Sequence, residues 1–200
     1  MTSFQELMTH RVGMHKLFFN IAKEHHDRYQ ILEADFNKLN NEPLNSDEAE
    51  KRLFNLQECY EEMASCAVIT VTFAAMCLEA FFYDLGASKL GDRFVLDNLD
   101  KLDIKSKFLV YPKLICGQSP DKSHVAYERL TKLVKLRNEL IHFKSQPFEL
   151  DHIHKASEFH DDLNMQLKEG VKNSIICVKE ILKTLDHLIA GSTFAMQIDW

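Results

Sequence analysis

The sequence predicts an all-α protein, an up-and-down bundle of four long helices with a short irregular helical insertion. Apolar residues recur at spacings of three and four over long stretches, and no segment alternates as a half-buried strand does. Prolines separate these stretches, at positions 43, 112, 120 and 147. A chain of 200 residues, 46% apolar and 27% charged, suits one globular domain. We expect residues 1–190 to form that domain and residues 191–200 to follow it as a tail.

The first half of the chain is expected to contain two long helices. The first covers residues 3–40, with Gly13 as a point where it can bend. The second covers about residues 47–85, with Ser46 as a plausible N-cap. The short, irregular helical insertion follows over residues 92–117.

Part of the second helix, "MASCAVITVTFAAMCL", carries no charge for 16 residues, over positions 63–78. A bilayer requires about 20 apolar residues, and Glu62 and Glu79 bound the stretch. We therefore expect a buried core helix and no contact with a membrane. The N-terminus lacks the apolar region of a signal peptide, which favours a cytoplasmic protein.

The last two helices are expected over residues 121–144 and 151–190. Asp121 or Ser123 is the candidate cap of the former. The latter has apolar residues spaced by threes and fours, and Gly170 is a position at which it can break.

Charge is distributed unevenly along the chain, whose net charge is −6. Residues 99–144 hold ten Lys/Arg and five Asp/Glu, a local +5, and the remainder holds 14 Lys/Arg and 25 Asp/Glu, a local −11. A basic segment on an acidic body favours one local anionic ligand over a general coat for nucleic acid. The five cysteines include no CxxC pair, which favours core packing in a reducing, intracellular setting.

The segment "KLVKLRNELIHF", residues 132–143, holds the candidate site. At about 100° per residue, Arg137 falls inside the apolar arc of this helix, flanked by leucines. Asn138 and His142 are four residues apart and share a second face. Arg137 is therefore expected to point toward another helix or another subunit.

A guanidinium on a core face requires an anionic partner. The candidate is Glu79, the only carboxylate in the apolar part of the second helix, "AAMCLEAFF". Two interpretations stay open. One is a structural Arg137–Glu79 ion pair that fixes helix register, and the other is a phosphate-binding arginine that Glu79 steers and partly neutralises until substrate arrives.

The segment "LRNELIHF" resembles the signature of the HEPN superfamily, helical bundles marked by Arg, often followed by Asn, and by His after four to six residues. Here four residues separate Arg137 from His142, and Asn138 follows the arginine directly. "FAAMCLEAFFYDLG" is similar to the second long helix of these proteins, so the resemblance covers roughly residues 47–145.

The resemblance implies a metal-independent endoribonuclease in which Arg and His of two protomers meet at a homodimer interface. His142 would be the general acid and base for attack of a ribose 2′-OH on the adjacent phosphate. Arg137 would stabilise charge on the phosphoryl oxygens, and Asn138 would orient the imidazole or contact substrate. The resemblance also implies a toxin or a phage-defence effector, with RNA as substrate and an antitoxin or regulatory protein as partner. The alternative is a non-catalytic HEPN-like interaction or nucleotide-binding module with a structural Arg137–Glu79 pair.

These side chains suit phosphoryl transfer on physical grounds. An imidazole with an ordinary pKa of about 6.5 can take and give a proton near neutral pH, and a guanidinium holds two phosphoryl oxygens at once. On an ideal helix Arg137 and His142 are about 140° apart. Either the helix loosens near Ile141, or the site draws the two side chains from different subunits.

Several histidines lie close together in sequence, namely His25 with His26, and His152 and His154 followed by His160. Adjacent residues on a helix diverge by about 100°, and no tight set of four Cys/His ligands appears. We expect solvated histidines, no metal and no other cofactor.

Overall fold

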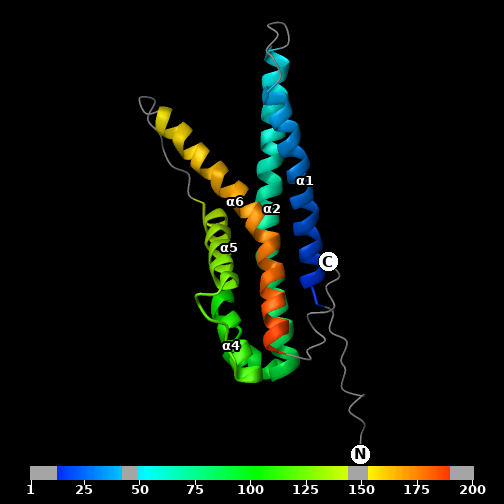
Figure 1. Ribbon diagram of the computed structural model, residues 1–200, viewed down its shortest axis with the longest axis vertical. Coiled ribbons are helices and arrows are strands. Elements are labelled where there is room, and N and C mark those ends of the chain that lie inside the picture. The colour runs from blue at the N-terminus through cyan, green and yellow to red at the C-terminus, as the bar shows by residue number, and fades with distance from the viewer. Residues whose placement is uncertain (1–12, 42–48, 144–152, 190–200) are drawn as a thin grey trace, which may run out of the picture.

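The computed structural model describes residues 13–41, 49–143 and 153–189, with side chains in the last helix from residue 161 onward. No strand lies within these ranges, and the four long helices alternate in direction, which confirms the all-α, up-and-down bundle (Figure 1). The helices in chain order are α1 (His15–Asn41), α2 (Ala49–Leu90), α3 (Asp92–Asn98), α4 (Ile104–Cys116), α5 (Val125–Ile141) and α6 (Ile153–Leu188).

The helices α1 and α2 lie side by side along most of α1 (Figure 1). The expected start of the first helix and the expected cap at Ser46 lie outside the described residues. Near the start of α1, His15 and Asp84 form a buried polar pair, with 2.9 Å between Nδ1 and Oδ2. α2 continues five residues beyond the expected end, to Leu90. Gly86 lies inside this last stretch of α2, and a Cβ there would lie 2.6 Å from the Tyr111 ring, so the glycine permits close packing of α2 against α4.

Among the described residues, α2 is the one helix that is long and apolar enough to cross a membrane. Length and composition are weak evidence for a span, because the core helix of a soluble protein has both properties, and 56% of the most apolar window is buried inside the bundle.

The three cysteines of α2, Cys59, Cys66 and Cys77, are buried in the bundle. Burial raises the pKa of Cys77 to about 12, so its thiol stays protonated and unreactive.

The insertion between α2 and α5 consists of two regular helices, α3 and α4. The carboxylate of Asp103 caps α4 by accepting the backbone N–H groups of Lys105 and Ser106, at 2.9 and 3.0 Å. Pro112 lies inside α4 and not between helices. A proline is tolerated in the second half of this helix, because its missing backbone N–H removes a single hydrogen bond.

The cap of α5 differs from the expected one. His124 is the N-cap, and its Nδ1 accepts the N–H of Ala126 at 3.1 Å. Asp121 instead accepts the N–H of Ser123 at 2.8 Å, in the turn before the helix. Both expected caps were wrong because residues 121–124 form a separate turn before the helical spacing begins.

Gly170 does not interrupt α6, which is continuous from Ile153 to Leu188. A Cβ at this position would lie 2.2 Å from Cδ2 of Leu136 and 3.2 Å from Cγ2 of Val71. The glycine therefore permits close approach of α6 to α5 and α2. The expectation of a break was wrong because packing, and not backbone freedom, explains the residue.

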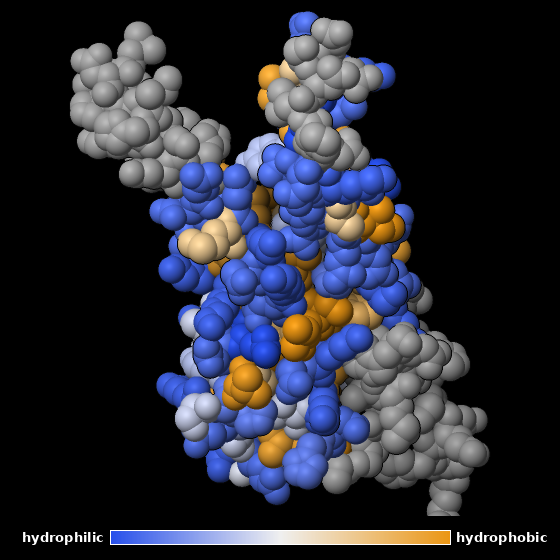
Figure 2. Space-filling model, turned by 45° about the horizontal axis from the view of Figure 1, so that its top comes forward, coloured by the Kyte–Doolittle hydropathy of each residue, from blue (hydrophilic) through white to orange (hydrophobic). Residues whose placement is uncertain are grey.

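The main core draws buried apolar residues from all six described helices. A smaller group, which includes Tyr29, Leu32 and Leu167, joins α1, α2 and α6. The face of the molecule in Figure 2 is mostly hydrophilic, with an apolar patch near its centre and smaller apolar patches elsewhere.

Candidate active site

Arg137 lies on the side of α5 that faces α2, as its place in the apolar arc indicates. Its Nη2 is 3.4 Å from Oε1 of Glu79, so the two residues form an ion pair across 58 positions of sequence. A quarter of the Arg137 side chain is exposed, against 41% for Glu79. The guanidinium is therefore neither sealed in the core nor free in solvent.

The contacts of Arg137 leave part of its hydrogen-bonding capacity unused. Charge-assisted N–H···O bonds are typically about 2.7–2.9 Å long, and the contact with Glu79 is longer. Nη1 donates to Oδ1 of Asn138 at 3.1 Å. Nε is buried and has no acceptor among the described residues. A guanidinium carries five N–H donors, so Arg137 has donors left for an anionic ligand.

Asn138 is exposed, and its side chain contacts Arg137. The amide oxygen therefore orients the guanidinium and not the imidazole of His142. The backbone of Asn138 does reach that residue, because its carbonyl accepts the N–H of His142 at 3.0 Å. Both roles expected for Asn138, orienting an imidazole and contacting substrate, stay predictions.

His142 is the residue at which α5 ends. Its backbone, at φ −103° and ψ 23°, leaves the helical conformation. The helix thus ends at Ile141, three residues before the expected end and at the position where loosening was one of the two alternatives. The imidazole is exposed and forms no hydrogen bond within the described part of the chain.

The chain thus brings three of the four expected site residues into contact, namely Arg137, Glu79 and Asn138. His142 follows on the same helix but bonds to neither the guanidinium nor the carboxylate within the described residues. The chain thus presents a partly buried guanidinium and, five positions later, an exposed imidazole.

The sequence pattern does not single out Arg129, another partly buried arginine of α5. Nη1 of Arg129 donates to Oδ1 of Asn173 at 3.2 Å, and Nδ2 of Asn173 donates to the carbonyl of Arg129 at 3.0 Å. Its Nε is also buried without an acceptor among the described residues. The one signal in the sequence is the basic excess of residues 99–144, which does not name a residue.

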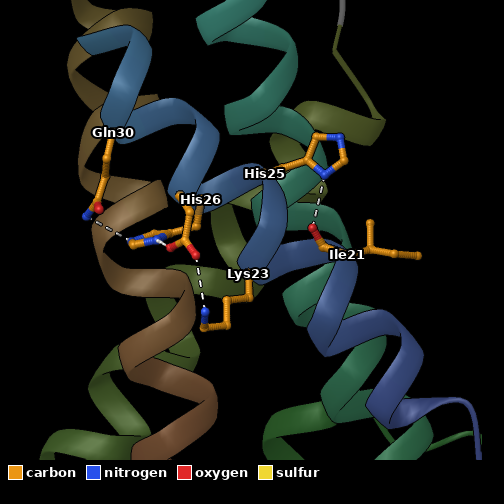
Figure 3. A network of polar contacts seen from close by, with 6 residues as sticks. Ile21, Lys23, His25, His26 and Gln30 are labelled. Carbon is orange, nitrogen blue, oxygen red and sulfur yellow. Dashed lines mark hydrogen bonds and ion pairs between the residues drawn. The ribbon is translucent and has the colours of Figure 1, made fainter. Parts of the chain in front are cut away.

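Two adjacent histidines of α1 do not form a metal site. Nδ1 of His25 donates to the carbonyl of Ile21 at 3.0 Å, and Nδ1 of His26 donates to Oδ1 of Asp27 at 3.1 Å. Figure 3 shows the two rings pointing apart. The hydrogen bond from His26 and the neighbouring Lys23 hold the pKa of Asp27 below its usual value.

No group of three His, Cys, Asp or Glu residues is arranged to hold a metal within the described ranges. The histidines between residues 152 and 160 lie outside the described side chains. Compared with known proteins, the chain matches no family model, no curated protein and no solved structure.

Proposed function

We propose that this protein is a metal-independent endoribonuclease of HEPN type that works as a cytoplasmic homodimer. The observation that carries the proposal is the state of Arg137. Its side chain is three-quarters buried, its contact with Glu79 is loose at 3.4 Å, and its Nε lacks an acceptor among the described residues. A guanidinium held in this way suits binding of a phosphoryl group better than it suits a purely structural bond.

The reaction follows from the chemistry of the two side chains. The imidazole of His142 takes the proton of a ribose 2′-OH while O2′ attacks the adjacent phosphorus. The bond from phosphorus to O5′ breaks, and the leaving oxygen takes a proton from an imidazolium. Arg137 stabilises the charge on the non-bridging oxygens. The products are a 2′,3′-cyclic phosphate and a 5′-OH end.

A homodimer explains how both side chains reach one phosphate. On an ideal helix they are about 140° apart, and His142 lies at an exposed helix end. The flanking side chains of Ile141 and Phe143 are 50% and 52% exposed, so apolar surface next to the histidine is available for burial against a second copy. Two copies of His142 also supply one base and one acid.

Glu79 has a defined role in this proposal. Without RNA, its carboxylate offsets the charge of Arg137 and orients the guanidinium. When a phosphate binds, the long contact with Glu79 weakens at small cost, because the pair is partly exposed. Toxin or phage-defence activity, restrained by an antitoxin, is the biological setting that we propose for such an enzyme.

The second candidate is a non-catalytic interaction module. It is favoured by the contact between Arg137 and Glu79, which joins α5 to α2 within one chain without any ligand. In this reading the pair fixes the register of the two helices, and RNA is not a substrate.

The experiment is incubation of purified protein with a mixed RNA pool in EDTA. We expect fragments with 2′,3′-cyclic phosphate ends, whose formation is lost in His142→Ala and Arg137→Ala and is insensitive to chelation. Matched controls are His187→Ala and Arg93→Ala, which change an exposed histidine of α6 and an exposed arginine of α3 and retain cleavage. Folded wild-type protein that cleaves no RNA, or equal cleavage by all variants, contradicts the proposal.

A further inference from the structure

A cleft of about 410 Å³ lies between α5 and α6, and nothing in the proposed reaction uses it. Its lining includes four basic residues from two helices, Arg129, Lys132 and Lys135 of α5 and Lys172 of α6. Three of these residues belong to the segment 99–144, which holds ten Lys/Arg, and Lys172 comes from the otherwise acidic remainder of the chain.

Two of these four cations are already paired with acids on α5. Lys132 lies 2.7 Å from Glu128, and Lys135 lies 3.7 Å from Glu139. Arg129 and Lys172 form no ion pair within the described part of the chain, and Arg129 interacts only at longer range with Glu128. The lining also contains Glu169, which is likewise in no ion pair there. Two unpaired cations against one unpaired carboxylate leave the cleft positive.

Arg129 is held in place before any ligand arrives. Asn173 bonds both to the guanidinium, at 3.2 Å, and to the backbone carbonyl of Arg129, at 3.0 Å. The Nε of Arg129 is buried and has no acceptor among the described residues. Because an amide carries no charge, these contacts orient the guanidinium without neutralising it. Binding of a ligand therefore does not cost the conformational entropy of ordering this side chain.

The chemistry of the cleft selects the class of ligand. An ordered guanidinium next to an ammonium matches the oxygens of a phosphate group. The apolar residues of the lining, Leu133, Leu136 and the exposed Ile176, suit a base or the face of a sugar. We infer that the α5–α6 cleft binds a phosphate group carried by a nucleotide or by an RNA strand.

This binding site is separate from the proposed catalytic one. Arg137 contacts α2, whereas Arg129 contacts α6. Lys132 and Arg137 are about 140° apart around α5. The inference therefore does not depend on RNA cleavage, and it survives if the proposed catalysis fails.

Three probes test the inference by titration in EDTA: inorganic phosphate, AMP, and a fluorescein-labelled 2′-O-methyl RNA decamer, which has no 2′-OH for cleavage. The key variant is Lys172→Glu, because this exposed side chain can change without loss of the fold. Arg129→Gln is the second variant. Lys183→Glu is the control, an equal charge change at an exposed position of the same helix outside the cleft lining.

We expect at least one probe to bind, and Lys172→Glu and Arg129→Gln to weaken its binding by about tenfold or more. Lys183→Glu should weaken it far less. Binding of AMP but not the decamer identifies a free nucleotide, and the reverse identifies an RNA backbone, in both cases through the same two cations. Absence of binding by both AMP and the decamer, with or without binding of inorganic phosphate, overturns the inference, as does equal weakening by Lys183→Glu and Lys172→Glu.

Discussion

Two arginines of α5, eight positions apart, are held in the same way but are partnered differently. Both Arg129 and Arg137 have a buried Nε that lacks an acceptor among the described residues. Arg137 faces α2 and meets the carboxylate of Glu79, at 3.4 Å. Arg129 faces α6 and meets the amide of Asn173, at 3.2 Å.

The difference is one of charge. A carboxylate both orients and neutralises a guanidinium, whereas an amide only orients it. The charge of Arg137 is therefore partly offset by Glu79, whereas no ion pair offsets the charge of Arg129 among the described residues. Partial burial of a charge without an opposite charge costs free energy, so the placement of Arg129 points to use of that charge.

The largest effect is expected for Arg137→Lys. Lysine keeps the charge but loses the planar fork that holds two phosphoryl oxygens. RNA cleavage should fall by about 100-fold, while the free energy of unfolding changes by less than about 0.5 kcal/mol. Initial rates on a fluorogenic RNA and urea denaturation measure the two quantities. Cleavage near the wild-type rate would show that Arg137 does not hold two phosphoryl oxygens at once.

Gly170→Val should disturb the packing of α6 against α5. The new side chain would collide with Leu136 and Val71 and push α6 away from α5. We expect a loss of about 2 kcal/mol in the free energy of unfolding and weaker phosphate binding in the cleft. Lys183→Val, at an exposed position of α6, should cost about 0.5 kcal/mol. Equal stability of the two variants in urea contradicts the close packing described for Gly170.

Replacing each of the two asparagines that orient the arginines should lower the free energy of unfolding by different amounts. Asn173→Ala removes two partly buried hydrogen bonds, and the expected cost is about 1.5 kcal/mol. Asn138→Ala removes one exposed contact, for which we expect about 0.5 kcal/mol or less. Thermal or urea denaturation of both variants measures the difference, and the opposite order of stability rules out Asn173 as the anchor of Arg129.

Only a small effect on stability is expected for Glu79→Gln. The pair is partly exposed and long, so its loss should cost about 0.5 kcal/mol. The same change leaves the charge of Arg137 unopposed, and affinity for the uncleavable RNA decamer should rise several-fold. A loss above about 2 kcal/mol with no gain in affinity would favour the structural interpretation of the pair.

Local spacing predicts the helices of this protein well, because apolar residues at helical period can be recognised in one segment without knowing which helix packs against it. Leu167, Val171, Val178 and Leu182 of α6 are all buried as that spacing requires. The ends are predicted less well. His124 caps α5 in place of Asp121 because several residues in that turn can accept a backbone N–H, and the backbone path decides which one does.

Part of the candidate site follows from sequence for a similar reason. Glu79 is the sole carboxylate of an apolar stretch, so its pairing with a core-facing Arg137 leaves few alternatives. The pairing of Arg129 with Asn173 has no such signal, because a neutral amide 44 positions away does not stand out. The α5–α6 cleft depends on how two helices cross, which no single segment encodes. Catalysis and dimerisation stay predictions.

The length of α2 has a consequence for how this sequence can change. Its 42 residues form one uninterrupted rod of about 63 Å. Insertion of a single residue anywhere between Cys66 and Glu79 would turn everything beyond it by about 100° and shift it by about 1.5 Å along the axis. Glu79 would then miss α5, so natural variation in chain length has to be confined to the connections at the ends of this rod.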